Sequence, residues 1–330
     1  MNVLVTGATG FVGSQLCRGL IERGHTVRAF HRPSSKLRLL EGLEVEHALG
    51  DLTQPETLEA AMDGMEAVFH AAAWMGGPEQ GGRQYAVTVE GTRSLLQAAR
   101  KSGIRRVVHT SSVAALGLPD ERSGPSTLLD ERHTWNYRPD YYPYGYAKYL
   151  AELEVQKAVA QGLDVVIVNP TLIFGAGDFY RQSQSLITQV AVRRLTAAVE
   201  GGINCVHITD VVEGHLAALE CGARGQRYIL GGENLTHAQL LAVIAEVTGV
   251  PAPNQILPTR LVRAAAGPAQ LLQSFLSLPV SATLLRLAGY YFYYDTRKAQ
   301  SALGLGLSRP VRDAVAEAHA WFTQPGERTG

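Results

Sequence analysis

Cysteine is scarce in this sequence: Cys17, Cys205 and Cys221 are spread over 330 residues. An odd number of scattered cysteines provides neither a disulfide framework nor the paired spacing of a metal site. We therefore expect no metal and a reducing, cytoplasmic location. Met1 leads directly into an apolar run, so we also expect no signal peptide.

An excess of charge of either sign is missing too, because 30 Lys and Arg balance 30 Asp and Glu. Proteins that bind nucleic acid or an anionic membrane usually carry a basic face. Neither kind of partner is expected here. The length of the chain and its 46% apolar content instead indicate a globular enzyme with one large domain and a smaller lobe.

Charge is absent altogether from residues 264–285, a stretch long enough to cross a bilayer. Gly267-Pro268 and Pro279 interrupt the stretch, and several Gln and Ser residues dilute it, so we do not expect a membrane span. We predict a pair of apolar helices that close a substrate pocket.

The N-terminal stretch carries the first motif. An apolar run, Asn2 to Thr6, precedes Gly7, Gly10 and Gly13, and a helical pattern follows from residue 14 to residue 23. A buried strand, a glycine turn and a helix N-terminus let the backbone approach a pyrophosphate and point N–H groups at it. The context predicts a dinucleotide site; an ordinary tight turn is the alternative.

The wording TGATGFVG, from Thr6 to Gly13, resembles the extended, epimerase-like branch of the short-chain dehydrogenase/reductase superfamily. The resemblance implies an α/β fold, a Rossmann-type doubly wound parallel sheet with a smaller C-terminal substrate lobe. We expect residues 1–175 to form the dinucleotide-binding domain, with a strand and a helix added from about 204–222, and residues 176–330 to form mainly the substrate lobe. Within the motif, the residues expected to bind the cofactor are Gly7, Thr9, Gly10, Phe11, Val12 and Gly13.

The residues after the second predicted strand, 25–30, lack the acidic side chain that would bind a ribose 2′-OH and repel a 2′-phosphate. They read His31-Arg32-Pro33-Ser34-Ser35-Lys36. Cations and hydroxyls suit a phosphate dianion, so we predict NADP rather than NAD, with His31, Arg32 and Lys36 beside the 2′-phosphate. A solvated basic loop is the alternative.

Three further segments are assigned to the cofactor by resemblance. Asp51-Leu52 follows the strand predicted over 43–48 and matches the family's adenine-binding pair; a helix cap near residue 55 is the alternative role of Asp51. The segment after the strand predicted over 67–70 resembles the family's HxAA stretch. The remaining residues expected to contact the cofactor are Ala71, Ala72, Ala73, Pro170 and Ile173.

A candidate catalytic trio completes the resemblance. Residues 109–117, HTSSVAALG, are similar to the family's TSSxAxxG signature, which makes Ser112 the catalytic serine. Tyr144 and Lys148 stand four residues apart, so on a helix they share one face, and an ammonium near a phenol lowers the phenol pKa. Ser112 would donate to the carbonyl oxygen, Tyr144 would transfer the proton, and Lys148 would also hold the nicotinamide ribose. The alternatives are a helix-cap serine and a surface Tyr–Lys pair.

The spacing excludes the neighbouring Tyr141, Tyr142 and Tyr146 from this pairing. Three positions depart from the patterns of the superfamily. Thr88 replaces the usual Asn of the NVxGT stretch, and Asn169 and Ile203 stand where nucleotide-sugar enzymes carry Arg.

The wording GGIN at residues 201–204 and YDTRKA at residues 294–299 resembles instead the dihydroflavonol-4-reductase-like group of bacterial reductases. We predict an NADP-dependent oxidoreductase acting on the carbonyl or secondary alcohol of a small, apolar or aromatic substrate. A nucleotide-sugar epimerase or dehydratase with retained cofactor is one alternative. A non-catalytic NADP-binding regulator is the other, although such proteins usually lose the Tyr or the Lys.

The predicted pocket walls are apolar: Trp74, Met75, Leu172, Phe179 and residues 264–285. Apolar walls give a diphosphate little compensation for lost water. Arg181 or Arg193 would weaken this prediction if either turned inward. We also expect a homodimer, formed by the helices that begin near Tyr85 and Tyr141.

Overall fold

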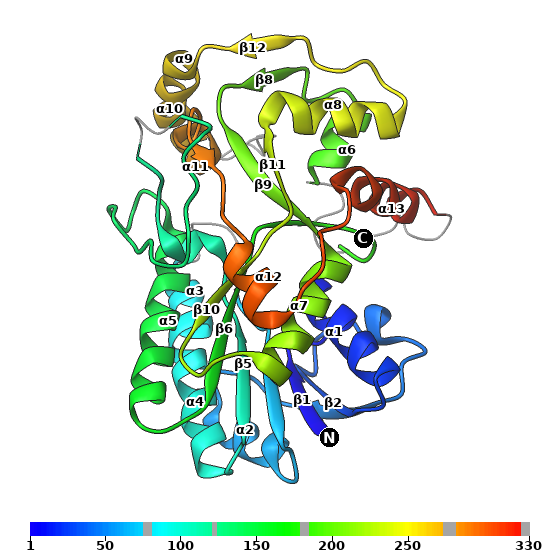
Figure 1. Cartoon of the computed structure of the whole chain (residues 1–330), viewed down its shortest axis with the longest axis vertical. Coiled ribbons are helices and arrows are strands. Elements are labelled where there is room, and N and C mark those ends of the chain that lie inside the picture. The colour runs from blue at the N-terminus through cyan, green and yellow to red at the C-terminus, as the bar shows by residue number, and fades with distance from the viewer. Residues whose placement is uncertain (75–80, 121–123, 179–184, 273–281, 325–330) are drawn as a thin grey trace.

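The computed structural model describes residues 1–74, 81–120, 124–178, 185–272 and 282–324. A large parallel sheet forms the lower part of the molecule in Figure 1, and a smaller lobe lies above the carboxyl ends of its strands. The sheet carries helices on both faces, so the predicted Rossmann-type α/β fold is confirmed.

The seven strands of the large sheet are all parallel and lie in the order β10-β6-β5-β4-β1-β2-β3. Their bounds are β1 Asn2–Thr6, β2 Thr26–His31, β3 Val45–Leu49, β4 Ala67–His70, β5 Arg106–Thr110, β6 Val165–Pro170 and β10 Arg227–Leu230. The strand order reverses between β1 and β4. Open α/β sheets bind ligands beyond the carboxyl ends of the strands at such a point.

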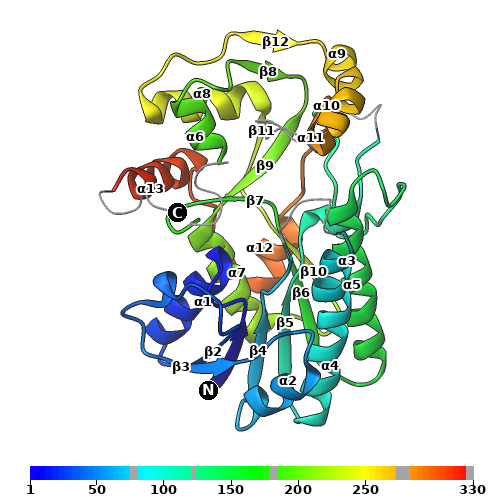
Figure 2. The same cartoon turned by 180° about the vertical axis from the view of Figure 1, so that it is seen from behind.

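Both faces of the large sheet are buried, which explains its continuous apolar strands. Val3 and Val5 of β1 belong to one core, under α1 (Phe11–Glu22), α7 (Ile208–Cys221) and α12 (Arg297–Leu303). Leu4, between them, points to the opposite face. The core on that face is covered by α2 (Pro55–Met62), α4 (Gly91–Lys101) and α5 (Pro143–Ala160), and Figure 2 shows α4 and α5 away from α1.

The second lobe is built on shorter strands. In its main sheet, β9 pairs with β7, β11 and β13, and β8 pairs separately with β12. The bounds of these strands are β7 Leu172–Phe174, β8 Ala197–Val199, β9 Gly202–His207, β11 Glu233–Thr236, β12 Gln255–Leu257 and β13 Tyr291–Phe292. The bounds of the helices are α6 Leu186–Ala191, α8 His237–Thr248, α9 Thr259–Ala264, α10 Ala266–Leu272, α11 Ala282–Arg286 and α13 Val311–Thr323.

The structure corrects two expectations about this half of the chain. The strand that joins the large sheet is β10, whereas residues 204–207 lie in β9 of the second lobe; the expected helix, α7, does pack against the large sheet. The sequence pattern predicts a helix over residues 182–198, but residues 197–199 form a strand, because β12 supplies a partner from far along the chain. The division of the chain near residue 175 stays a prediction.

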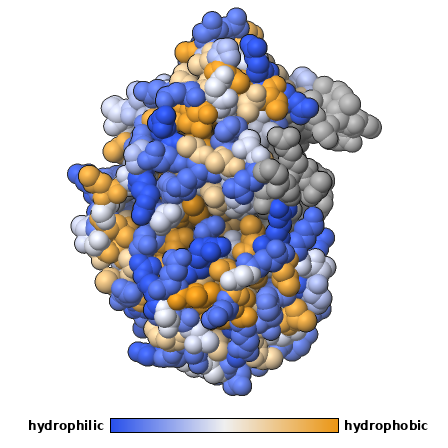
Figure 3. All heavy atoms as spheres, turned by 90° about the vertical axis from the view of Figure 1, so that its right-hand side faces the viewer, coloured by the Kyte–Doolittle hydropathy of each residue, from blue (hydrophilic) through white to orange (hydrophobic). Residues whose placement is uncertain are grey.

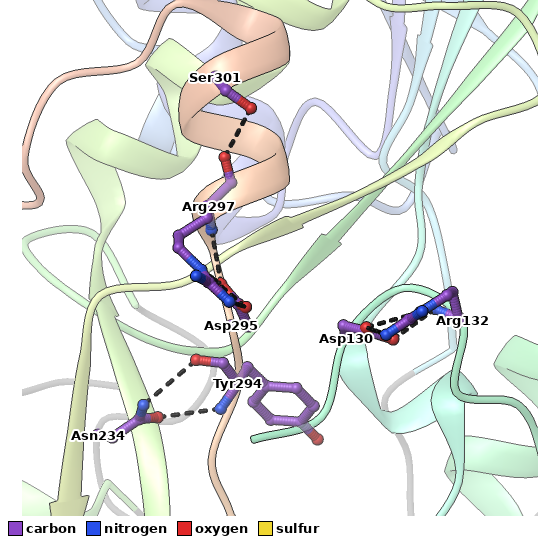
Figure 4. A network of polar contacts seen from close by, with 7 residues as sticks. All are labelled: Asp130, Arg132, Asn234, Tyr294, Asp295, Arg297 and Ser301. Carbon is purple, nitrogen blue, oxygen red and sulfur yellow. Dashed lines mark hydrogen bonds and ion pairs between the residues drawn. The ribbon is translucent and has the colours of Figure 1, made fainter. Parts of the chain in front are cut away.

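The segment after β13 joins the two lobes. Asn234 of β11 holds the backbone of Tyr294 on both sides, its Nδ2 donating to O at 3.2 Å and its Oδ1 accepting from N at 3.1 Å (Figure 4). Leu129, which follows the large sheet's fifth strand, accepts from the backbone N–H of Asp295 at 2.9 Å. Asp295 Oδ1 in turn accepts from the N–H of Arg297, the first residue of α12.

The uncharged stretch of residues 264–285 contains α10 and the beginning of α11, and residues 273–281 lie outside the described part of the chain. Among the helices that the structure describes, none has the length and apolar character needed to cross a membrane.

Candidate active site

A cleft of about 1730 Å³ extends from the carboxyl ends of β1, β2 and β4 into the second lobe. Pockets for one small ligand measure about 300–1,000 Å³, so this cleft has room for a dinucleotide and a second molecule. Figure 3 shows apolar residues among hydrophilic ones at mid-height on the face that carries α1 and α13.

All the residues that the sequence assigned to cofactor and catalysis line this one cleft: Gly7, Thr9, Gly10, Phe11, Val12, Gly13, His31, Arg32, Lys36, Asp51, Leu52, Ala71, Ala72, Ala73, Ser112, Tyr144, Lys148, Pro170 and Ile173. The structure thus brings together segments from the first half of the chain that are far apart in sequence. The roles of the individual residues stay predictions.

The glycine turn between β1 and α1 has no space for side chains. Gly7 has φ +71°, and a Cβ on it would lie 2.7 Å from the backbone N of Ala72. A Cβ on Gly13 would lie 2.1 Å from Gly7 O. The helix begins at Phe11, three residues earlier than predicted, and its N-cap Gly10 provides no side chain to bind the first N–H groups. The turn therefore fits a dinucleotide pyrophosphate.

The predicted 2′-phosphate cradle forms one wall of the cleft. Arg32 and Lys36 are exposed, as is Ser34, and all three line the cleft. His31 is buried, and its Nε2 lies 2.9 Å from Nδ1 of His47 on β3. The exposed cationic groups of this wall are therefore Arg32 and Lys36, whereas His31 is buried against His47.

Asp51 does not cap α2. Its Oδ1 accepts from the N–H and the hydroxyl of Thr53 at 2.9 and 2.8 Å, and the N-cap residue of α2 is Gln54. The side chain is therefore held in a turn on the wall of the cleft.

Ser112 follows β5 and begins a short 3₁₀ helix, Val113–Leu116. Its Oγ accepts from the N–H of Ala114 at 3.2 Å, so it has the capping role that we gave as the alternative. Because this bond uses only the oxygen lone pairs, the hydroxyl proton can still be donated into the cleft.

Tyr144 and Lys148 lie on the first two turns of α5, which begins at Pro143. Lys148 is 3% exposed, and its Nζ donates to the backbone O of Thr110 at 2.9 Å. Burial lowers the pKa of Lys148 to about 8, against the opposing effect of the Glu152 carboxylate. The ammonium therefore stands close to its titration point near neutral pH.

Of the three neighbouring tyrosines that the spacing argument set aside, Tyr141 and Tyr146 do not line the cleft, whereas Tyr142 does. Tyr141 donates its hydroxyl proton to Arg286 O at 3.0 Å, and Tyr146 packs against Trp135 with ring centroids 5.4 Å apart. Tyr142 lines the cleft beside Tyr144, with ring centroids 6.3 Å apart.

Thr88, where the family usually has Asn, steadies backbone. It lies in a π-helical turn, Ala86–Glu90, and its Oγ1 accepts from the N–H of Trp74 at 3.2 Å. Thr88 O accepts from Thr92 Oγ1, which contacts His70 Nε2 at 3.0 Å. Thr88 therefore connects the loop after β4 to the buried ends of the strands.

Asn169, at a position where nucleotide-sugar enzymes carry Arg, is not among the residues that line the cleft. Its Nδ2 donates to Glu152 Oε1 at 2.7 Å and to Ser112 O at 2.9 Å, and the residue is fully buried. Sequence reasoning also missed Glu152. Its position four residues after Lys148, on the same helix face, was the available signal.

Ile203, the other position without Arg, does line the cleft from β9. Arg193 is exposed and lies away from the cleft lining, whereas the adjacent Arg194 belongs to it. Arg83 also lines the cleft, with its guanidinium 4.5 Å from the Trp74 ring centroid. Met75, Phe179 and Arg181 lie outside the described residues.

Comparisons with known proteins agree with this geometry. The model of the NAD dependent epimerase/dehydratase family matches residues 3–231. The chain is 36% identical to sterol demethylase protein B of Methylococcus capsulatus, over 99% of both chains. It is 36% identical to a putative dihydroflavonol 4-reductase of Synechocystis, over 98% of this chain and 94% of that protein. The crystal structure of gox2253 is similar with a TM-score of 0.85 and 36% identity, over 99% of both chains.

The fold, the glycine turn and the matched family model define the class: the chain belongs to the NAD dependent epimerase/dehydratase family. Within that family it is an NAD(P)-dependent oxidoreductase of the extended short-chain dehydrogenase/reductase type, with dihydroflavonol 4-reductase-like relatives. The resemblance read from the sequence is confirmed.

Proposed function

We propose that this protein is an NADP-dependent reductase of an apolar or aromatic carbonyl compound, or the corresponding alcohol dehydrogenase. The observation that carries the proposal is the convergence of Ser112, Tyr144 and Lys148 on one cleft with the glycine turn. A regulator that only binds the cofactor has no need of this trio.

The residues of the cleft fit a nicotinamide dinucleotide. The uncapped N-terminus of α1 and the space kept free at Gly7 and Gly13 suit the pyrophosphate. Arg32 and Lys36 would hold the 2′-phosphate, Asp51 the adenine, and Lys148 the nicotinamide ribose. When bound, the cofactor supplies or accepts the hydride.

The protein's own part in the reaction is the movement of one proton. In reduction, Ser112 donates a hydrogen bond to the substrate oxygen, and Tyr144 gives that oxygen its hydroxyl proton. The Lys148 ammonium stabilises the phenolate that remains. In oxidation the phenolate takes the proton back from the alcohol.

The walls beyond the trio support an apolar substrate. Leu172, Leu195 and Ile203 line the cleft from the second lobe. Burying apolar ligand surface contributes about 25 cal/mol per Å², whereas a diphosphate needs cations in compensation. Arg194 is the observation that favours the alternative, a nucleotide-sugar epimerase or dehydratase, since it is a cation on the same lining.

A substrate panel tests the proposal. NADPH absorbance should report turnover of a dihydroflavonol, an aromatic ketone or a ketosteroid, and UDP-hexoses should not raise the thermal unfolding temperature of the NADP complex. If only a UDP-hexose stabilises the complex, and Arg194→Ala removes the effect, the alternative function is correct.

A further inference from the structure

The backbone that carries Ser112 is held from behind by two buried side chains. Ser111 Oγ donates to Glu152 Oε1 at 2.5 Å, and Asn169 Nδ2 donates to Ser112 O at 2.9 Å. Glu152 comes from α5 and Asn169 from β6, so two elements fix the segment at the end of β5. The direction in which Ser112 presents its hydroxyl depends on both.

Glu152 is the centre of this network. It is 0% exposed, and its Oε1 also accepts from Asn169 Nδ2 at 2.7 Å. Its Oε2 forms an ion pair with Arg227, whose Nε lies 2.6 Å away, on β10 at the edge of the sheet. The angles of this contact do not meet those of a hydrogen bond. A buried ion pair is often replaceable by apolar residues without loss of stability, so stability alone gives little reason for a carboxylate here.

Lys148 lies one helical turn before Glu152 on the same face of α5. Burial lowers the pKa of Lys148, and the Glu152 carboxylate opposes that effect. The other titratable groups near Lys148 are His70 of β4, His109 of β5 and Tyr144 of α5. Burial lowers the pKa of both histidines, which are therefore neutral and provide no countercharge.

We propose that Glu152 is a positioning residue of the active site: anchored by Arg227 and Asn169, it fixes the segment that carries Ser112 and keeps Lys148 charged. The inference rests on the proposed function. The face of α5 behind Ser112, Tyr144 and Lys148 then takes part in the reaction, which a purely structural ion pair would not do.

Glu152→Gln tests the proposal because it keeps the size of the side chain and removes the charge. Oxidation of an alcohol needs the Tyr144 phenolate, which a neutral Lys148 no longer stabilises. A nearby opposite charge moves a pKa by about 1–3 units, so the ascending limb of the kcat/KM–pH profile should move by about one unit to higher pH. On that limb the rate falls about tenfold for each such unit.

Glu154→Gln is the matched control. Glu154 is also a buried carboxylate of α5, ion-paired with Arg93 and Lys157 on the side away from the cleft. Its variant should keep the wild-type profile. If Glu152→Gln folds and its profile coincides with that of wild type, or only falls in height, the positioning role is wrong.

A second measurement needs no turnover. Lys148 loses its proton at a lower pH in the folded protein than in the unfolded chain. In the pH interval between the two pKa values, the free energy of unfolding therefore rises with pH. Removing the Glu152 charge lowers the pKa of folded Lys148 further, so this interval begins at a lower pH. The stability gap between wild type and Glu152→Gln in urea should therefore shrink from neutral pH to about pH 8, and the gap for Glu154→Gln should stay constant.

If Glu152→Gln alone does not fold because Arg227 is left unpaired, the double variant Glu152→Gln/Arg227→Met removes both charges. It should show both shifts in the same direction but smaller, because the loss of the Arg227 cation partly offsets the loss of the carboxylate. A constant gap and an unshifted profile in the double variant would overturn the inference. Absence of turnover in the wild-type protein would count against the proposed function, and the stability gap would still decide the effect of Glu152 on Lys148.

Discussion

Arg32 and Lys36 differ from the other candidate site residues because they are exposed at the mouth of the cleft. Their side chains would reach the proposed 2′-phosphate through solvent, so screening would limit what they contribute. The proposed selectivity between the two dinucleotides would therefore rest on few, moderate interactions, whereas the proposed chemical step also uses Lys148, which is buried.

Arg32→Ala should remove most of the preference for NADPH over NADH. A hydrogen bond to a charged group contributes about 1.5–3 kcal/mol, and the exposed position places Arg32 at the lower end, which is roughly tenfold in relative Kd. Fluorescence titration with both cofactors measures the effect. Arg18→Ala, an exposed arginine of α1 away from the cleft, is the control. Equal affinity of the wild-type protein for the two cofactors would contradict the assignment.

The residues that sequence could and could not assign differ in the kind of contact they make. The shared helix face of Tyr144 and Lys148 follows from their spacing, since four residues make about one turn, and the family resemblance assigned their roles. Glu152 stands at the same spacing, but its partners Asn169 and Arg227 come from strands whose positions only the fold defines.

At the scale of elements, the strands of the large sheet were predictable within a residue or two. The inner strands are apolar runs buried on both faces, so their own sequence defines them, whereas β3 at the edge of the sheet is half exposed. The second lobe lacked this signal. Residues 197–199 form β8 because Gln255–Leu257 lies beside them, and the local sequence carries no signal of a partner so far along the chain. The N-cap Thr236 was predictable because its capping box with Gln239 is local.

The ends of β4 and β5 enclose three buried histidines. Burial lowers the pKa of His70 to about 3 and of His215 to about 4, and the pKa of His109 is lowered as well. Folded rings stay neutral while unfolded rings take up protons below their ordinary pKa of 6.5. The stabilising contribution of these neutral histidines is therefore fully present above pH 6.5, and it is lost as the pH falls toward 4.

We expect each of these histidines to lower the free energy of unfolding by about 2 kcal/mol between pH 7 and pH 5. Urea unfolding at the two pH values measures the loss. His215→Gln should reduce the loss by that amount, whereas His319→Gln, on α13, should leave it unchanged. An identical loss in wild type and His215→Gln would show that His215 is protonated in the folded protein.

At the scale of the whole molecule, the predicted homodimer would pair α4 and α5 across a two-fold axis. The exposed residues of these two helices are mixed in character. Leu153 of α5 is exposed, but Gln97 and Arg100 of α4 and Lys157 of α5 are exposed beside it. The dimer stays a prediction.

Sedimentation at micromolar concentration should give the mass of two chains. Leu153→Lys should shift the equilibrium toward monomer by placing two cations across the axis. Leu307→Lys, at a leucine that is 94% exposed elsewhere, is the control and should remain a dimer. A monomeric wild-type protein would contradict the prediction.

The central claim is that Tyr144 transfers a proton in a hydride reaction, and Tyr144→Phe tests it most directly. The variant keeps the ring and loses only the hydroxyl, so turnover of the carbonyl substrate should fall by about 10²–10⁴-fold. NADPH affinity, measured by fluorescence, should stay close to wild type. Tyr146→Phe, two residues along the same helix and outside the cleft lining, should keep full activity. Turnover retained by Tyr144→Phe, or lost together with NADPH binding, would contradict the account.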